Sequence, residues 1–339
     1  MADGTLMAAE AASAPDRVAR LIRDEEGAIA AIAAALAESP PGLAVTVGRG
    51  SSDHVCTFAA WSFARWLGLP CMSLPPSLIT REAVPLRVQD ALLLAVSQSG
   101  RGADVVEVMG WAGQAGACTV ALVNDPASPL AEAARFVLDQ QAGPEQSVAA
   151  TKSVICSMAA VQALTAALAG RPALRSALMR LPDDLAGAVG RADHLPIEKL
   201  AHAHNAFVLG RGAGLAAGLE IALKLKETCG LSAEALSAAE VRHGPREVVG
   251  PGFLVLAIAL PGPSEPDVRA ASAELAQQGA DILTLGTRPG DDWILPSIDP
   301  VNAPLAALQL VYPAIARAAQ ARGRDPDRPR TLSKVTSTF

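Results

Sequence analysis

Aromatic residues are scarce in this chain of 339 residues, which has one tyrosine, four tryptophans and six phenylalanines. Basic residues are also outnumbered, with 28 Lys and Arg against 34 Asp and Glu, so the net charge is −6. Proteins that bind nucleic acid present a broad basic surface, which this composition disfavours. We therefore expect no nucleic-acid partner and a small ligand whose anionic group meets only local basic groups.

Cysteines are few, odd in number and widely spaced, at positions 56, 71, 118, 156 and 229. This pattern disfavours a disulfide framework and favours a reducing compartment. The N-terminus, Met1 to Asp16, has no basic region followed by an apolar core, so it does not resemble a signal peptide. We expect no apolar run of the chain to cross a bilayer. We expect a cytoplasmic protein with no membrane partner.

Metal-ligand and cofactor motifs are also missing. Among the five histidines only His202 and His204 are close, and no cysteine or carboxylate cluster completes a ligand set. The turn Gly48 to Ser52 lacks the third glycine of a dinucleotide fingerprint, and no Walker lysine is present. We expect no metal and no cofactor.

Short apolar runs alternate with helical stretches along the chain, which is typical of a parallel α/β sheet. Residues Ala14 to Glu38 have helical spacing and end at a Ser-Pro-Pro-Gly stop. An alanine-rich helical region from Ser153 to Leu181 ends at Pro182, near which we place the domain junction. The strands predicted before it are 43–47, 70–74, 91–96, 119–124 and 135–138, with helices at 53–66 and 103–115.

The pattern then restarts, with strands predicted at 206–209, 253–260 and 281–285 and a helix at 215–228. Both halves begin with an apolar strand that ends in Gly-Arg-Gly, and Gly48 and Gly210 are 162 positions apart. This order predicts an internal duplication of one α/β unit.

Two loops of the first half carry short hydroxyls where a predicted strand meets a predicted helix. They are Gly48 to Ser52, with Gly50, Ser51 and Ser52, and Ser97 to Gly100, with Gln98 and Ser99. Helix N-termini at the carboxyl edge of a parallel sheet suit a bound phosphate. The alternative is that these residues only form turns and cap helices. The matching strand of the second half runs into Pro261, Gly262 and Pro263 instead, so only one half is expected to hold the anion.

The helix predicted in the second half carries Glu220, Lys224 and Glu227 on one face. These charges form either a solvated stripe of ion pairs or a polar ligand site in which Glu227 carries a proton. The loop Glu240 to Pro245 contains His243, which is either an exposed structural residue or the best acid/base candidate of the chain.

Taken in order, these segments resemble the SIS (sugar isomerase) family. Within it, they resemble the isomerase half of glucosamine-6-phosphate synthase and the stand-alone SIS-type glucosamine-6-phosphate deaminases. The segments that carry the resemblance are 48–52, 97–100, Val148-Ala149-Ala150-Thr151-Lys152, 219–227, 240–245 and the tail Pro329-Arg330-Thr331-Leu332-Ser333-Lys334.

The resemblance implies two tandem SIS domains, each a parallel sheet flanked by helices as in flavodoxin. The implied boundaries are a helical segment at 1–40, a first SIS domain with the phosphate loops at 41–190, a second SIS domain with the catalytic helix and histidine loop at 191–322, and a closing tail at 323–339. No glutaminase domain is expected before the first SIS unit.

The resemblance also implies a reaction, the conversion of glucosamine 6-phosphate to fructose 6-phosphate and ammonia. Glu227 would move a proton between C1 and C2, His243 would open the sugar ring, and Lys334 would form a Schiff base or close the site. Glu220 and Lys224 would orient these groups. The residues implied to bind the phosphosugar are Gly50, Ser51, Ser52, Ser97, Gln98, Ser99, Gly102, Ala150, Thr151 and Lys152.

A homodimer follows from the resemblance as well, because the family's histidine comes from the neighbouring subunit and the active site lies at that interface. Gly102 departs from the family's pattern, which commonly has a hydroxyl residue there, so a phosphate hydrogen bond is lost or replaced by Arg101. Galactosamine 6-phosphate, a fructosamine phosphate, the reverse synthesis from ammonia and a non-catalytic phosphosugar regulator stay open as alternatives.

Overall fold

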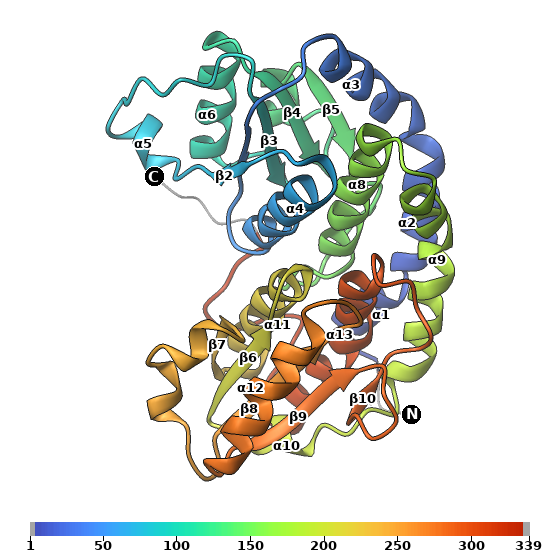
Figure 1. The fold of residues 1–339 in the computed structure, drawn as a ribbon, viewed down its shortest axis with the longest axis vertical. Helices are drawn as coiled ribbons and strands as arrows, with labels where there is room; N and C mark the ends of the chain where they lie inside the picture. Colours follow the sequence, from blue (N-terminus) through green and yellow to red (C-terminus); the bar gives the residue numbers. More distant parts are fainter. Residues whose placement is uncertain (1–3, 335–339) are drawn as a thin grey trace. The chain divides into compact units, whose positions relative to one another are not determined.

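The computed structural model describes residues 4–334 and divides them into two compact units, each built on one five-stranded sheet (Figure 1). The first-sheet unit comprises Asp16–Glu145 and Lys152–Arg180. The second-sheet unit comprises 4–15, Gln146–Thr151 and Leu181–Lys334. Residues 1–3 of the predicted N-terminal segment and 335–339 of the predicted tail lie outside the described residues.

All strands of the first sheet are parallel, in the order β2-β1-β3-β4-β5. The chain therefore adds β2 on one side of β1 and the later strands on the other. The strands are β1 Ala44–Val47, β2 Cys71–Ser73, β3 Leu92–Ser97, β4 Cys118–Val123 and β5 Phe136–Asp139.

Helices cover both faces of the first sheet, which is why its inner strands are continuous apolar runs. Leu93, Ala95 and Ala121 face a core formed with the apolar side of α6. On the other face α4 packs against α8, and α3 packs against α8 as well. The helices of this unit are α2 Ala14–Asp24, α3 Glu26–Glu38, α4 Ser51–Leu67, α5 Ser77–Thr80, α6 Ala103–Gln114, α7 Pro129–Ala133 and α8 Lys152–Ala169.

The second sheet repeats this plan in the order β10-β9-β8-β6-β7, again with parallel strands. Helix α12 lies over β8 and β9, and α11 packs against α13 (Figure 1). Its strands are β6 Asn205–Gly210, β7 Ser232–Ser237, β8 Leu254–Ala259, β9 Asp281–Gly286 and β10 Trp293–Ile294. Its helical elements are α1 Leu6–Ala12, α10 Glu198–His202, α11 Ala213–Cys229, η1 Glu240–Arg242, η2 Pro245–Val248, α12 Glu265–Gln277 and α13 Ala303–Ala321, and α9 Pro172–Ala192 connects the two units along the chain.

Strand register shows how closely the two halves repeat. Ala44 pairs with Leu92 in the first sheet, and Ala206 pairs with Leu254 in the second. Each second-sheet residue of this pair lies 162 positions after its counterpart, the spacing that also separates Gly48 from Gly210. The predicted α/β class with two tandem parallel-sheet domains is confirmed.

Two expected helix boundaries are wrong. The helical region does not end at Pro182, because α9 runs through that proline and the break lies at Gly170 and Arg171. An internal proline costs a helix about 3 kcal/mol, but the buried row Leu178, Leu181 and Leu185 holds this helix in place. The leading segment is not one helix either, since it breaks at Glu25 between α2 and α3.

One described helix does meet the length and hydropathy test for a membrane span, contrary to expectation. It is α8, and 83% of its apolar stretch is buried inside the protein. Buried helices in protein cores have the same length and hydropathy, and α8 is the central helix of the first-sheet unit.

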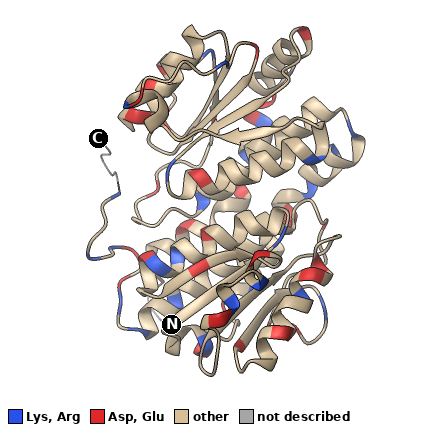
Figure 2. Cartoon of the chain, turned by 60° about the vertical axis from the view of Figure 1, so that its left-hand side comes forward, with Lys and Arg blue, Asp and Glu red and all other residues tan. Residues whose placement is uncertain are grey.

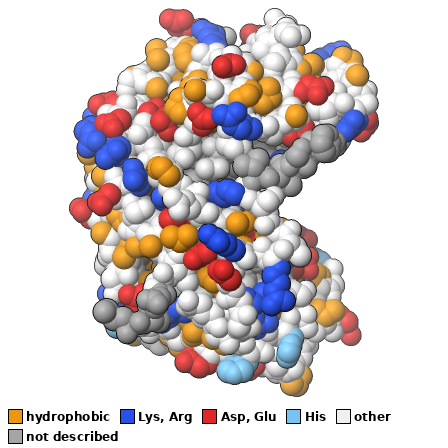
Figure 3. Space-filling model, turned by 180° about the vertical axis from the view of Figure 1, so that it is seen from behind, with side chains coloured by type: hydrophobic (Ala, Val, Ile, Leu, Met, Phe, Trp, Pro, Cys, Tyr) orange, Lys and Arg blue, Asp and Glu red, His pale blue; other side chains and the backbone are white. Residues whose placement is uncertain are grey.

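Charged residues of both signs are spread over the elements of both units (Figure 2). On the face drawn in Figure 3, Lys and Arg side chains alternate with Asp and Glu and form no single broad patch.

A glycine at the end of β6 gives a test of the fold. A Cβ on Gly210 would lie 2.4 Å from the Gly214 carbonyl oxygen, because the first turn of α11 crosses directly over it. We expect Gly210→Ala to lower the free energy of unfolding by about 2 kcal/mol or more. Gly190 lies inside α9 with nothing within 4 Å of its added Cβ, so Gly190→Ala should be neutral or stabilising by up to about 1 kcal/mol. If urea unfolding gives the same change in stability for Gly210→Ala and Gly190→Ala, the close packing of α11 over Gly210 is contradicted.

Candidate active-site elements

The first sheet reverses its strand order between β1 and β3, so the loops after these neighbouring strands turn to opposite sides. Ligands of open parallel sheets bind in the crevice at such a point. The loop after β1 leads into α4 at Ser51, and the loop after β3 leads into α6 at Ala103. The structure thus brings the two predicted phosphate loops to one edge of one sheet.

The helix starts at this edge have no side-chain caps. Their N-cap residues are Gly50 and Gly102, which carry no side chain. Ser97 Oγ accepts a hydrogen bond from the Gly100 N–H at 3.0 Å, so this hydroxyl shapes its own loop. Ser99 Oγ likewise accepts from the Arg101 N–H at 3.4 Å. These two hydroxyls shape the loop and do not cap a helix, and the starts of α4 and α6 are suited to an anion.

Arg101 and Gly102 connect the loop after β3 to the start of α6. A Cβ on Gly102 would meet Asp104 Oδ1 at 3.4 Å, an ordinary contact, so the backbone has room for a larger residue there. Arg101 pairs with Asp125 at 2.9 Å, and both side chains are exposed. Asp125, in the loop after β4, therefore engages the Arg101 guanidinium. That Arg101 replaces a hydrogen bond to the phosphate stays a prediction.

An ion pair that sequence reasoning missed joins the two loops. Arg49 Nε and Nη2 both donate to Asp104 Oδ2, at 2.9 and 2.6 Å, and Asp104 is buried. The second repeat has the same arrangement, with Arg211 and Asp267 at 2.9 Å. The repeated Gly-Arg-Gly, followed in each half by an aspartate in the first turn of the helix after β3 or β8, was the available signal.

The matching edge of the second sheet lacks the polar groups of the first. At the constant spacing of 162, Ser51, Ser52, Ser97, Gln98 and Ser99 correspond to Ala213, Gly214, Ala259, Leu260 and Pro261.

Carboxylates stand at this second edge as well. Glu265 begins α12 and accepts from Arg269 at 2.8 Å, and Arg269 also donates to both oxygens of Asp291. The hydrogen bond to Asp291 raises the pKa of Arg269. Since Asp53 and Asp104 likewise lie in the first turns of α4 and α6, acidic helix starts occur in both repeats, and the hydroxyls and the amide distinguish the first edge.

Ala150, Thr151 and Lys152 follow one another at the start of α8. Thr151 and Lys152 are buried, and Lys152 Nζ donates to the Pro144 carbonyl at 2.5 Å. This amine anchors the loop that precedes α8. Thr151 belongs to the second-sheet unit and Lys152 to the first-sheet unit.

The three charges on α11 are not a solvated stripe. The side chains of Glu220 and Lys224 are each 1% exposed, and that of Glu227 is 21% exposed. Lys224 Nζ lies 3.4 Å from Glu220 Oε1 and donates a short hydrogen bond to Glu227 Oε2. The chain's single tyrosine, Tyr312 of α13, donates to Glu220 at 3.4 Å.

Burial makes this cluster costly, since ions leave water at a penalty of several kcal/mol each. Lys224 offsets part of that cost for both carboxylates, and Tyr312 adds a donor for Glu220. Glu227 is the member that keeps contact with solvent. The arrangement therefore presents one accessible carboxylate whose position is fixed by a buried lysine.

His243 and Lys334 lie on the same unit as this cluster. His243 is exposed at the end of η1, and its imidazole makes no hydrogen bond to any residue in the described range. Lys334 Nζ donates to the Ser147 carbonyl at 2.7 Å. The exposed position of His243 leaves its ring accessible to another molecule.

Comparison with known proteins agrees with this architecture. The SIS domain model matches residues 42–167 and 199–295. The chain belongs to the SIS domain family. A glutamine–fructose-6-phosphate aminotransferase (isomerizing) from Methanothermobacter thermautotrophicus is 32% identical over 304 residues, which are 86% of this chain and 51% of that protein. The SIS chain thus spans about half the length of the curated relatives it matches, and is homologous to that part of them.

Solved structures give the same result. A proposed phosphosugar isomerase from Silicibacter pomeroyi DSS-3 is 39% identical, with a TM-score of 0.87 over 95% of this chain and 100% of that one. A glucosamine-6-phosphate deaminase from Thermotoga maritima has a TM-score of 0.74 and 22% identity, over 95% of this chain and 100% of that one. This second likeness is one of fold.

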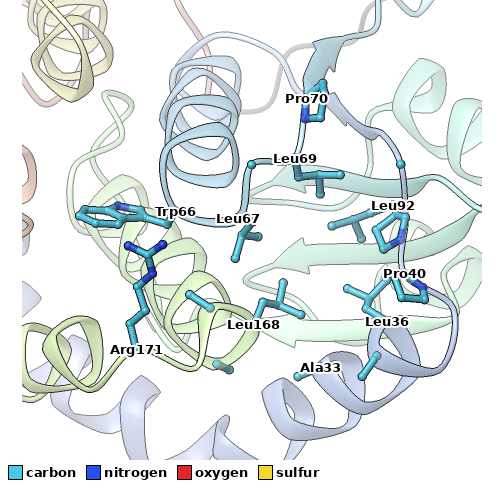
Figure 4. A pocket seen from close by; sticks show the side chains of 16 residues that line it. Ala33, Leu36, Pro40, Trp66, Leu67, Leu69, Pro70, Leu92, Leu168 and Arg171 are labelled. Atoms are coloured by element: carbon cyan, nitrogen blue, oxygen red, sulfur yellow. The ribbon is translucent and has the colours of Figure 1, made fainter.

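A pocket of about 560 Å³ in the first-sheet unit lies away from these residues (Figure 4). It is lined by Pro40, Leu67, Leu92 and Leu168, at the amino ends of the strands. Arg171 is its one charged side chain and lies beside the ring of Trp66, at 5.7 Å. Its lining side chains are mostly apolar and it lies at the opposite edge from the predicted phosphate loops, so we do not assign the sugar phosphate to it.

Removing the buried lysine tests the charge cluster. Lys224→Met leaves two carboxylates without their common partner, so we expect it to lower the free energy of unfolding by about 3–5 kcal/mol. Arg175→Met is the control, because Arg175 and Glu26 form a surface pair at 3.9 Å with both side chains 77% exposed. That variant should change stability by less than about 1 kcal/mol. A Lys224→Met protein as stable as the control in urea unfolding would contradict the cluster.

Proposed function

We propose that this SIS protein is an isomerising deaminase that converts glucosamine 6-phosphate to fructose 6-phosphate and ammonia. The observation that carries the proposal is the partly exposed Glu227, held by the buried Lys224, which also pairs with Glu220. Such a fixed carboxylate suits proton transfer between adjacent carbons. The similarity to phosphosugar isomerases and to the isomerizing aminotransferases supports the substrate class.

The phosphate is assigned to the first repeat. Ser51, Ser52, Ser97, Gln98 and Ser99 surround the starts of α4 and α6, whose dipoles and N–H groups favour a dianion. The Arg49–Asp104 pair joins the two loops, and Gly102 is assigned to the second of them. Ala150, Thr151 and Lys152 are assigned to the sugar.

The second repeat is assigned the proton transfer. His243 helps to open the pyranose ring, and Glu227 then removes the proton on C2 of the open-chain 2-amino aldose. The electron pair of the C2–H bond forms the C1–C2 double bond of an enolamine, while the π pair of the C1 carbonyl moves to O1, which takes up a proton. Return of the proton to C1 uses the C1–C2 π pair, and the nitrogen lone pair forms the C2 imine. Water adds to this imine and releases ammonia and the ketose.

His243 and Lys334 complete the proposal. An exposed imidazole suits a residue that acts in a neighbouring subunit, so we assign a homodimer in which His243 serves the partner's site. Lys334 closes the site through its tail, or exchanges with the imine as a Schiff base. We place the protein in the cytoplasm, where sugar phosphates are available.

A substrate panel tests the proposal directly. Purified protein is incubated with glucosamine 6-phosphate, galactosamine 6-phosphate, a fructosamine phosphate, or fructose 6-phosphate plus ammonia, and ammonia and ketose phosphate are measured. We expect ammonia and fructose 6-phosphate from the first. Turnover of another member of the panel alone would overturn the substrate, and thermal stabilisation by phosphosugars without turnover would indicate a regulator.

Glu227→Gln separates proton transfer from binding. The amide cannot accept the C2 proton, so we expect exchange of this proton with deuterated solvent, followed by NMR, to fall by at least about 100-fold. Fructose 6-phosphate should still bind with a similar Kd. The control is Glu234→Gln, an exposed position of β7. Loss of binding with Glu227→Gln would reduce Glu227 to a structural charge.

Ser99→Ala tests the assignment of the phosphate to one repeat. A hydrogen bond to a charged group contributes about 1.5–3 kcal/mol, so the Kd of fructose 6-phosphate should rise by about tenfold or more. Ser264→Ala changes a serine at the start of α12, in the matching loop of the second repeat, and should leave that Kd unchanged. The reverse result in calorimetric titrations would assign the phosphate to the second repeat.

A further inference from the structure

The segment Gln146–Thr151 has neither helix nor strand, although it carries two of the predicted sugar-binding residues, Ala150 and Thr151. It also belongs to the second-sheet unit, whereas the residues on both sides of it belong to the first-sheet unit. Its backbone N–H groups need partners from outside the segment. Those partners come from two distant parts of the chain.

Glu10 of α1 supplies the first contact. Its Oε1 accepts a hydrogen bond from the Gln146 N–H at 2.5 Å, and its Oε2 accepts one from the Ser147 N–H at 3.1 Å. One carboxylate thus binds two successive amides, an arrangement in which the charge strengthens each bond. It fixes the direction of the backbone as it enters the segment.

Asp327 of the C-terminal tail supplies the second contact. Its carboxylate accepts from the N–H groups of Leu6 and Met7 at 2.8 and 2.7 Å, which caps the start of α1. Its main-chain carbonyl accepts from the Val148 N–H at 3.0 Å. This one residue therefore holds both α1 and the segment that Glu10 binds.

The helix that carries Glu10 is itself anchored. Met7 and Ala11 are fully buried, α1 packs against α13 (Figure 1), and Gln309 Nε2 of α13 donates to the Ala11 carbonyl at 2.9 Å. Lys334 then donates to the Ser147 carbonyl at 2.7 Å, on the residue whose N–H is held by Glu10. The position of the Lys334 amine therefore depends on the same short stretch of backbone.

We propose that Glu10 and Asp327 are positioning residues for the sugar-binding segment. By binding the amides of Gln146, Ser147 and Val148, they set the backbone that presents Ala150 and Thr151 and the carbonyl on which Lys334 docks. The two residues act through the segment. The expected effect of these residues on turnover rests on the proposed function. Their expected effect on the backbone rests on the hydrogen bonds alone.

The test uses the full chain and the variant Glu10→Ala. Amide hydrogen exchange at Gln146 and Ser147 should become about tenfold faster or more, because the charged acceptor that both amides share is lost. The kcat should fall by a similar factor, while the Kd of fructose 6-phosphate changes less than twofold, since the phosphate loops belong to the other unit. Glu10→Gln keeps an acceptor oxygen and should recover part of both effects. Glu38→Gln, exposed at the end of α3, is the control.

Unchanged exchange at these amides in Glu10→Ala would overturn the inference, and so would faster exchange with an unchanged kcat. If Glu10→Ala does not fold, Asp327→Asn takes its place. It should accelerate exchange at Leu6 and Met7, whose charged acceptor it removes, and at Gln146 and Ser147 through the loosened α1 that carries Glu10. If the unmodified protein turns over none of the panel, the proposed function fails separately. In that case the exchange rates alone decide whether Glu10 and the Asp327 cap of α1 hold the segment.

Discussion

Both units depend on one constraint, the reversal of strand order in a parallel sheet. Because β1 and β3 are neighbours but send their helices to opposite sides, the chain leaves a crevice at their carboxyl ends. The same holds for β6 and β8. Helix starts, loop glycines and the two Arg–Asp pairs all follow from that geometry, and they occur in both repeats at nearly constant spacing. Duplication therefore produced two crevices, which later sequence changes made different.

The difference between the crevices is chemical. The first keeps hydroxyls and an amide. The second has nonpolar residues at the matching positions, and at the start of α12 Glu265, Arg269 and Asp291 satisfy one another. The second repeat carries a buried charge cluster on α11, where Lys224 links Glu220 to Glu227. One scaffold thus has a hydroxyl-rich edge in one copy and a buried charge cluster in the other.

Much of this was predictable from the sequence, because apolar runs and Gly-Arg-Gly turns are local signals. The strands of the first sheet and the helix α11 were expected within a few residues. Strand β7 and helix α13 were not, since the β7 sequence Ser-Ala-Glu-Ala-Leu-Ser has weak strand preference and gains its place by pairing with β6. The run of α9 through Pro182 depends on packing. The contacts of Glu10, Asp327 and Arg49 join residues far apart in sequence, which no local pattern reveals.

We propose that the first repeat alone binds the phosphate of the substrate. A crystal structure of the protein with fructose 6-phosphate tests it most directly. We expect a phosphate within hydrogen-bonding distance of the loop from Ser97 to Gly102 and of the start of α4. A phosphate at the loops after β6 and β8, or in the apolar pocket at the amino edge of the first sheet, would contradict it.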